Sequence, residues 1–279
     1  MSNGLEFLQP NFNMNERELI QSAIKGNKAS LQKLIVSAQD QVYNLALRFL
    51  WNKMDAEDAT QEILIKLITN LSKFDGRSKF STWSYRVAVN YLINYKKTAL
   101  ENRLSSFDVF SQDLASATEL RDYNEPGKQL LEKEMKTGCT LAMLQCLNRD
   151  QRMAYILGGI LGINSILGAK LTNTTSQNFR KRLEQARKSL VNFLNKNCGV
   201  FNPANTCRCN KRIHYALAAG RIQTDNLNFR AKLESLNEEM EELNSLAGIY
   251  KNHGTFESST DLISQINHLI ATKQIMRLN

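Results

Sequence analysis

Residues 55–97 read DAEDATQEILIKLITNLSKFDGRSKFSTWSYRVAVNYLINYKK, and their pattern decides the fold expected for this part of the chain. Apolar residues recur every three or four positions on both sides of a polar break, which predicts two helices joined by a loop. Gly76 interrupts the pattern, and Ser81 or Thr82 is placed to cap a helix that reaches Lys97. The stretch therefore predicts a helix, a glycine-containing loop and a second helix.

The helix before the loop carries three acids, Asp55, Asp58 and Glu62, one turn apart on a single face. This face has two interpretations. In one, Asp55 is the N-cap and the acids stabilise the helix dipole, whatever the function. In the other, the carboxylates bind a partner.

The helix after the loop has two contrasting faces. Trp83, Val87, Tyr91 and Tyr95 recur every four residues and predict a face that packs in the core. Another side is polar and basic, and its members are Arg86, Asn90, Asn94 and Lys97. Aromatic and basic groups beside such a loop suit single-stranded DNA, whose unstacked bases need pockets and π-faces. A solvated face that binds nothing is the alternative.

The order DAEDATQE, FDGRSKFSTW, YRVAVNYLINYKK resembles the second conserved region of extracytoplasmic-function (ECF) sigma factors of the sigma-70 family. The resemblance implies contacts to the clamp helices in the largest subunit of core RNA polymerase through Asp55, Asp58, Gln61 and Glu62. It also implies a set of residues that bind and melt the minus-ten promoter element, namely Arg77, Ser78, Lys79, Phe80, Trp83, Arg86, Asn90, Lys96 and Lys97.

Outward from this stretch, long segments with a 3.6-residue period and only three prolines predict an all-α chain. Two small helical domains, a linker and a helical C-terminal extension are expected. In the first domain, two apolar stripes are expected to pack on each other. The first consists of Val42, Leu45, Ala46, Phe49 and Leu50. The second consists of Ile63, Leu64, Leu67, Ile68 and Leu71. The expected boundaries are 1–14 for a flexible tail, 15–100 for the first domain, 101–129 for the linker, 130–196 for the second domain, 197–224 for a cysteine-rich basic segment and 225–279 for a helical hairpin.

The second domain is expected to be a helix-turn-helix, because Thr174 or Thr175 can cap a helix with an apolar stripe. Its sequence, CLNRDQRMAYIL followed by GINSILGAKLTNTTSQNFRKRLEQARKSLVNFL, resembles the fourth conserved region of the same family. The resemblance implies that it meets the flap of the second-largest polymerase subunit. The implied upstream-box contacts are Thr175, Ser176, Gln177, Asn178, Lys181, Arg182 and Lys188. Gly168 departs from the family pattern and costs about 1 kcal/mol against alanine inside a helix. A basic amphipathic helix without groove contacts is the alternative.

Charge and cysteines are both concentrated near the end of this domain. Between Thr175 and Arg221 there are ten Lys or Arg and one acid, so 10 − 1 = +9, equal to the net charge of the whole chain. Such a segment indicates a polyanionic partner, here promoter DNA. Cys198, Cys207 and Cys209, with His214 as a fourth ligand, offer one zinc site, and the neighbouring bases are expected to lower the thiol pKa values. Buried structural thiols are the alternative, and Cys139 and Cys146 are expected to be plain core residues.

The C-terminal extension contains a heptad stripe from Phe229 to Tyr250 and a second helical stretch, Leu262 to Ile275. It is expected to contact the sigma domains, an inhibitor or a DNA-bound recruiting protein.

Several classes of function are not favoured by the sequence. Three scattered histidines and the lack of a phosphate-binding glycine loop speak against an enzyme. The longest apolar run is too short to insert in a membrane, so a bacterial cytoplasmic location is expected. The alternatives are a helix-turn-helix regulator with a metal- or redox-sensing cysteine cluster, and a coiled-coil adaptor.

Overall fold

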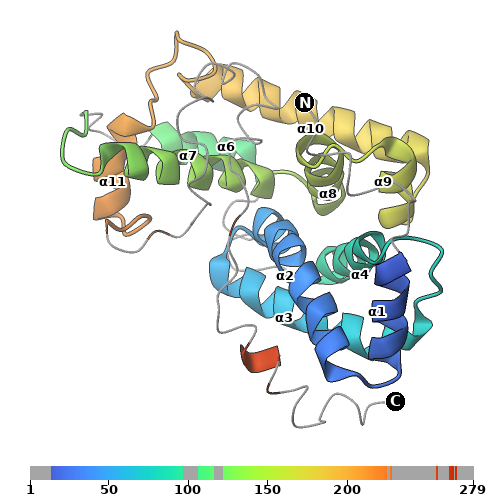
Figure 1. Ribbon diagram of the computed structural model, residues 1–279. Helices are drawn as coiled ribbons and strands as arrows, with labels where there is room; N and C mark the ends of the chain where they lie inside the picture. The colour runs from blue at the N-terminus through green and yellow to red at the C-terminus, as the bar shows by residue number, and fades with distance from the viewer. Residues whose placement is uncertain are drawn as a thin grey trace.

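The computed structural model describes residues 14–96, 106–115, 122–224, 227, 256, 264–266 and 268. The described segments are helical and are arranged as two groups (Figure 1). The first helical block comprises α1 (Met14–Ile24), α2 (Lys28–Leu50), α3 (Lys53–Thr69), η2 (Leu71–Lys73) and α4 (Phe80–Asn94). The second helical block comprises α7 (Lys128–Gln145), α8 (Arg149–Tyr155), the π-helical turn η3 (Ile156–Ile160), α9 (Ser165–Leu171) and α10 (Ser176–Asn197). The all-α expectation is confirmed.

Helix α2 is the centre of the first helical block and contacts α1, α3 and α4. Asn27 starts it by accepting a hydrogen bond from the Ser30 amide at 2.9 Å, and Trp51 ends it in the left-handed conformation, with φ of 61°. Its predicted stripe from Val42 to Leu50 is completely buried, and the facing stripe of α3 is buried except for the half-exposed Ile68. The packing of these two stripes on each other is confirmed.

The ends of α4 differ from those expected. The helix begins at Phe80, with Lys79 as N-cap and no side-chain cap, so neither Ser81 nor Thr82 caps it. It ends at Asn94, and Lys97 lies outside the described residues. The helix begins at Phe80, before the predicted caps, because the Phe80 ring is buried against Phe74. Tertiary packing of this ring stabilises the first turn in place of a polar side-chain cap.

The linker contains a helix that the sequence pattern did not indicate, α6 (Phe107–Ala115). Phe107 and Phe110 pack on Phe193 of α10, with ring centroids 5.3 and 5.1 Å apart. Only one side of α6 is apolar and it is short, so its signal is weak among the surrounding serines and acids.

Gly168, which departs from the family pattern, has a packing reason. A Cβ atom on Gly168 would lie 2.4 Å from Cζ of Phe179, so α9 approaches α10 more closely than any side chain would allow. The expected cap of α10 is confirmed as Thr175, whose Oγ1 accepts from the Asn178 amide at 3.1 Å. The pair α9–α10, joined by residues 172–175, is the predicted helix-turn-helix.

The two helical blocks pack directly on each other, and the buried residues of both form one apolar cluster. Arginines of α8 bind helix C-termini, where the last carbonyls lack partners within their own helix. Arg152 donates to the carbonyl of Phe49 in α2 at 2.9 Å, and Arg149 donates to the carbonyls of Ile93 and Tyr95 at the end of α4. The sequence predicted two domains joined by a linker, and the structure adds a direct interface between them.

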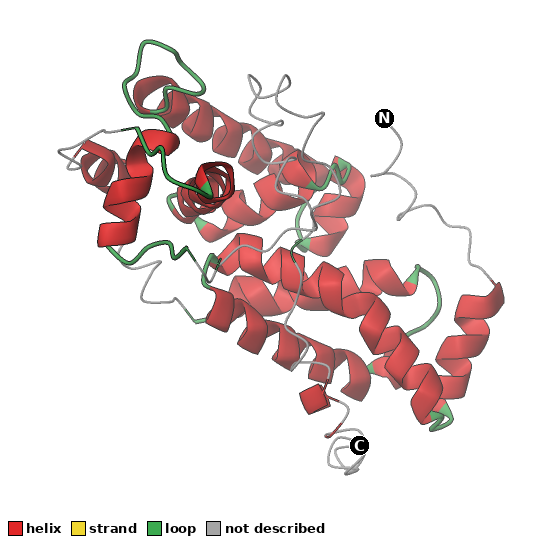
Figure 2. Ribbon diagram, turned by 60° about the vertical axis from the view of Figure 1, so that its left-hand side comes forward, coloured by secondary structure: helices red, strands yellow, loops and turns green. Residues whose placement is uncertain are grey.

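The cysteine-rich segment continues from α10 as a loop, a 3-10 turn η4 (Asn210–Arg212) and the short helix α11 (Ile213–Ala218), which packs on α7 (Figure 2). The predicted heptad stripe, the turn after it and residues 1–13 of the predicted tail lie outside the described residues. Of the second helical stretch, Ser264–Ile266 and His268 are described as helical. None of the helices in the described ranges has the length and apolar character needed to cross a membrane.

Candidate functional site

The acidic face of α3 is available on the surface of the first helical block. The amide of Asp55 donates to the side chain of Asn52 at 3.0 Å, so Asn52 is the N-cap and Asp55 lies in the first turn. Asp58 and Glu62 are exposed, while Asp55 is half-buried. Asp55 as the N-cap is therefore wrong, whereas an acid in the first turn that stabilises the helix dipole is confirmed for Asp55.

A cleft of about 790 Å³ separates this face from α4. Its lining residues are Asp55, Lys66, Asn70, Val87, Asn90, Tyr91, Asn94, Tyr95 and Lys96. Three residues of the predicted core stripe, Val87, Tyr91 and Tyr95, line this cleft, and all four residues of the stripe also pack against the core while partly buried. The fully buried face of α4 is a different one, formed by Phe80, Ser84, Ala88, Val89 and Leu92. Aromatic side chains suit a half-buried face, so the spacing predicted the contact with the core but not the exposed side of the rings.

The carboxylates and the aromatic wall are close enough to interact electrostatically. Burial raises the pKa of Tyr91, and the negative charge of Glu62 raises it further. The ammonium of Lys66 lies 5.7 Å from the centroid of the Tyr91 ring. Acidic, aromatic and basic groups therefore meet around one cleft.

The loop before α4 is a tight turn that presents a cation. Gly76 has φ of 69°, a conformation that favours glycine, and the Arg77 amide donates to Oδ1 of Asp75 at 3.0 Å. The guanidinium of Arg77 also donates to Asp75 at 2.6 Å, and its side chain remains 87% exposed. Ser78 and Lys79, which follow it, are half-buried.

One predicted minus-ten contact is wrong in this structure. Phe80 is only 3% exposed and packs against Phe74 and Trp83, so its ring is part of the core and cannot stack on a base. Trp83 is half-buried at the edge of this aromatic cluster. The residues of α4 and its end that are exposed are Arg86, Asn90, Asn94 and Lys96.

The first turns of α10 form a second polar surface. Gln177, Asn178, Lys181 and Lys188 are exposed, as is Thr175, and Ser176 is half-buried. The apolar stripe of α10 is buried except for the half-buried Leu183. The predicted upstream-box residues therefore share the outer side of the helix-turn-helix.

Not every base of the positively charged segment is available to a ligand. Arg182 pairs with Asp150 of α8 at 2.8 Å, and the guanidinium of Arg208 donates to the carbonyl of Pro203 at 3.1 Å. Arg212 is 4% exposed, and Arg221 pairs with Asp113 at 2.6 Å. The charge count of the segment thus overstates its free basic surface, because four of the ten bases hold the protein together.

The sequence comparisons agree with this geometry. The family model described as Sigma-70 region 2 matches residues 34–100, which include the carboxylate face, the loop and α4. An ECF RNA polymerase sigma-E factor of Haemophilus influenzae is 28% identical over 182 residues, covering 64% of this chain and 95% of the relative. The sigma-E factor of Escherichia coli K12 is 29% identical over 182 residues, with 64% and 94% covered. The protein is an ECF sigma factor.

Two further proteins are similar to this chain. The RNA polymerase sigma-H factor of Pseudomonas aeruginosa is 27% identical over 178 residues, covering 63% of this sigma factor and 91% of the relative. A solved structure of CnrH in complex with the cytosolic domain of CnrY covers 65% of this chain and 97% of that chain, with 19% identity and a TM-score of 0.45.

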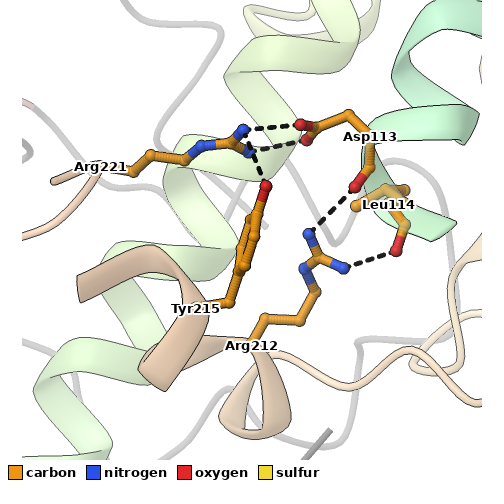
Figure 3. A network of polar contacts seen from close by, with 5 residues as sticks. All are labelled: Asp113, Leu114, Arg212, Tyr215 and Arg221. Carbon is orange, nitrogen blue, oxygen red and sulfur yellow. Dashed lines mark hydrogen bonds and ion pairs between the residues drawn. The ribbon is translucent and has the colours of Figure 1, made fainter. Parts of the chain in front are cut away.

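The linker of this sigma factor is held by the cysteine-rich segment through a polar network (Figure 3). Arg221 donates to both carboxylate oxygens of Asp113, at 2.7 and 2.6 Å. Arg212 donates to the carbonyl of Leu114 at 2.6 Å and to that of Asp113 at 3.5 Å, near the C-terminus of α6. The Tyr215 ring lies near both guanidiniums, 5.0 Å from that of Arg212 and 5.1 Å from that of Arg221. These bases cap α6 and neutralise its terminal acid.

The pair of Asp113 and Arg221 should make stability depend on pH in acid. The hydrogen bond from Arg221 lowers the pKa of Asp113 in the folded protein. The pair therefore contributes stability above the ordinary aspartate pKa of about 3.9, and this is lost as pH falls through the lowered value. We expect Asp113→Asn to cost less than about 1 kcal/mol at pH 7, because the pair is partly exposed. Thermal unfolding of both proteins should show a stability difference that shrinks below pH 4, and a constant difference would contradict the pairing.

The cysteines line a second cavity, of about 800 Å³, between α6, α7 and the cysteine-rich segment. Cys198, Cys207 and Cys209 share it with Cys139 of α7, which also packs against the apolar core as predicted. Burial raises the pKa of Cys207, and burial together with negative charge on Cys198 raises that of Cys209 to about 12. The expected lowering of these two thiol pKa values is wrong, because burial outweighs the nearby arginines.

The predicted zinc site is not formed in this geometry. His214 is exposed, its ring packs on Tyr123 with centroids 5.1 Å apart, and it does not line the cavity of the thiols. Across the described ranges, no three His, Cys, Asp or Glu side chains are arranged to hold a metal ion. The alternative of structural thiols fits Cys207 and Cys209, whose raised pKa values favour the protonated form.

Proposed function

We propose that this sigma factor divides promoter recognition between its two helical blocks, so that it brings core RNA polymerase to promoters and assists their opening. The observation that carries the proposal is the exposed acidic face of α3 beside the aromatic and basic cleft of α4. One face suits a basic protein partner and the other an opened DNA strand. Run-off transcription with purified core polymerase tests this, since a promoter-specific transcript requires both activities.

The polymerase contact is assigned to α3. Asp58 and Glu62 are exposed one turn apart, with Asp55 and Gln61 half-buried beside them. A rigid helix holds the carboxylates in fixed positions, which favours specific docking on a basic helical partner. The proposed partner is the pair of clamp helices in the largest subunit.

The minus-ten contact is assigned to the loop and to the exposed side of α4. Arg77, Arg86 and Lys96 provide cations for phosphates, while Asn90 and the tyrosines of the cleft provide hydrogen bonds and ring faces for bases. Phe80 is left out of this set because it is buried.

Replacing Arg86 or Asn90 with alanine should impair opening more than binding. Each side chain is exposed, so its loss leaves the fold intact and removes a contact to the separated strand. We expect open-complex formation to fall severalfold, by roughly 1 kcal/mol for one lost polar or stacking contact, at unchanged affinity for core polymerase. Permanganate footprinting of the minus-ten region measures opening. Normal melting in both variants would contradict the assignment.

The second helical block is assigned to the upstream promoter box and to the flap of the second-largest subunit. The first turn of α10 places Gln177 and Asn178 where side chains of a recognition helix reach base edges, and Lys181 and Lys188 follow for phosphates. Gly168 supports this assignment, because it permits the close packing of α9 on α10. The alternative of a regulator that never contacts polymerase is not favoured by the named relatives.

A further inference from the structure

Phe256, from the C-terminal extension, is bound by helix α2 of the first helical block. Its amide donates to Oδ1 of Asn44 at 2.7 Å, and its carbonyl accepts from Nδ2 of the same side chain at 2.7 Å. One asparagine amide thus pairs with both backbone groups of Phe256, as a neighbouring β-strand would. The two residues are 212 positions apart in the sequence.

The side chain of Phe256 is recognised as well. Its ring is 1% exposed, and the guanidinium of Arg48 lies 4.9 Å from the ring centroid. Arg48 is itself 6% exposed and donates to Oδ1 of Asn44 at 2.9 Å, so the two recognition residues support each other. A desolvated cation over an aromatic ring is a favourable electrostatic contact. We call the contacts of Asn44 and Arg48 with Phe256 the Phe256 seat.

A second apolar residue of the extension, Ile266, is also buried. Ile266, one of the helical residues 264–266, is 1% exposed and belongs to the continuous apolar cluster. These residues lie next to the first helical block in both ribbon views (Figures 1 and 2). The anchors are 266 − 256 = 10 positions apart, so the chain between them spans at most about 35 Å. Two described residues of the extension are therefore buried in the same apolar cluster.

We propose that the Phe256 seat is an internal docking site for the C-terminal extension, and that docking there lowers the affinity of this sigma factor for core RNA polymerase. The occupant is Phe256 of this same chain, held through both of its backbone polar groups and through its buried ring. The second half of the inference rests on the function proposed above, since it places the extension on the block that carries the polymerase contacts.

Docking of the extension weakens binding to core polymerase by competition for the first helical block. Helix α2, which carries the seat, packs along α3, whose outer face bears the proposed polymerase contacts. Phe256 and Ile266 are both buried in the apolar cluster that includes this block, so the docked residues of the extension lie at the block that polymerase must approach. If docked and undocked forms exchange, the apparent dissociation constant rises in inverse proportion to the undocked fraction.

The test uses the full chain with Phe256→Ala, Asn44→Ala and the double variant, and Asn197→Ala as a matched control. Asn197 donates to the carbonyl of Phe193 four residues earlier at 2.9 Å, as Asn44 donates to that of Asp40 at 2.7 Å, and it takes no part in the seat. Hydrogen exchange at the Phe256 amide reports docking in the free protein. Equilibrium binding to core polymerase reports competition.

We expect Asn44→Ala to speed exchange of the Phe256 amide at least about tenfold. The variant loses the hydrogen bond from this amide and part of its burial, so the conformation in which the amide is open to solvent becomes more populated. Core affinity should rise about threefold or more in Phe256→Ala and in Asn44→Ala, and no further in the double variant. Phe256→Ala keeps every contact of Asn44 within α2, so it remains informative if Asn44→Ala unfolds.

A fast-exchanging Phe256 amide in the unmodified protein would overturn docking. Release of the extension at unchanged core affinity would overturn the competition. If the unmodified protein does not bind core polymerase at all, the proposed function fails, while the exchange measurement still decides whether the seat is occupied.

Discussion

Replacing Arg152 with methionine should lower the free energy of unfolding by roughly 3 kcal/mol or more. Arg152 is 2% exposed and donates to the carbonyls of Leu144, Gln145 and Leu147 at the end of α7, as well as to that of Phe49. Methionine fills a similar volume but leaves these buried acceptors without their cation. Chemical denaturation measures the loss.

The location of Arg152 also determines how unfolding should look. Its guanidinium joins the C-termini of α2 and α7, one from each helical block, and lies 5.1 Å from the Phe49 ring. We expect one cooperative transition in the unmodified protein and two separated transitions in Arg152→Met. The matched control is Arg180→Met, because Arg180 is exposed and makes one long hydrogen bond, at 3.3 Å, to Ser165. Equal stability of the two variants would contradict the proposed role of Arg152 as the bridge.

Patterns of apolar residues predicted most of the helices, but the contacts at only some of their ends. The stripe of α2 and the cap at Thr175 were predicted correctly because each depends on residues three or four positions apart. The cap of α3 was assigned to Asp55 rather than Asn52, since both residue types suit an N-cap and the register decides between them. The spacing of apolar residues therefore predicts the presence of a helix more reliably than the residue at which the helix begins.

The errors at the candidate site arose from tertiary packing. Phe80 belongs to a recognisable motif, but its burial against Phe74 depends on how the loop between η2 and α4 folds, which no helical pattern predicts. Likewise, Arg212 adds to the charge of a basic segment, and its role as a cap on α6 depends on residues about a hundred positions away. The sequence predicted the kind of chemistry at each surface, whereas the choice of residues available to perform it required the tertiary structure.

Reversing the charge of Asp58 and Glu62 together, to lysine, should weaken binding to core polymerase at least tenfold, which corresponds to about 1.4 kcal/mol. Both side chains are exposed on the outer face of α3, and like charges facing a basic partner are strongly unfavourable. Stability should change by no more than about 0.5 kcal/mol per site, since only pairs one turn apart, such as Glu62 with Lys66, are altered. Titration of labelled core polymerase with each variant measures the effect.

Glu18→Lys is the matched control for this prediction, because Glu18 is an exposed acid on α1 of the same block and lies away from the α3–α4 cleft lining. It changes the net charge by +2 per site, as each reversal on α3 does, so a general electrostatic effect would appear in it too. Two results together would place the contact on α3. Binding should weaken only in the α3 variant, and added salt should restore it less than it would restore a diffuse charge effect. If the α3 variant melts normally and binds core polymerase within twofold of the unmodified protein, the carboxylates do not form the polymerase contact.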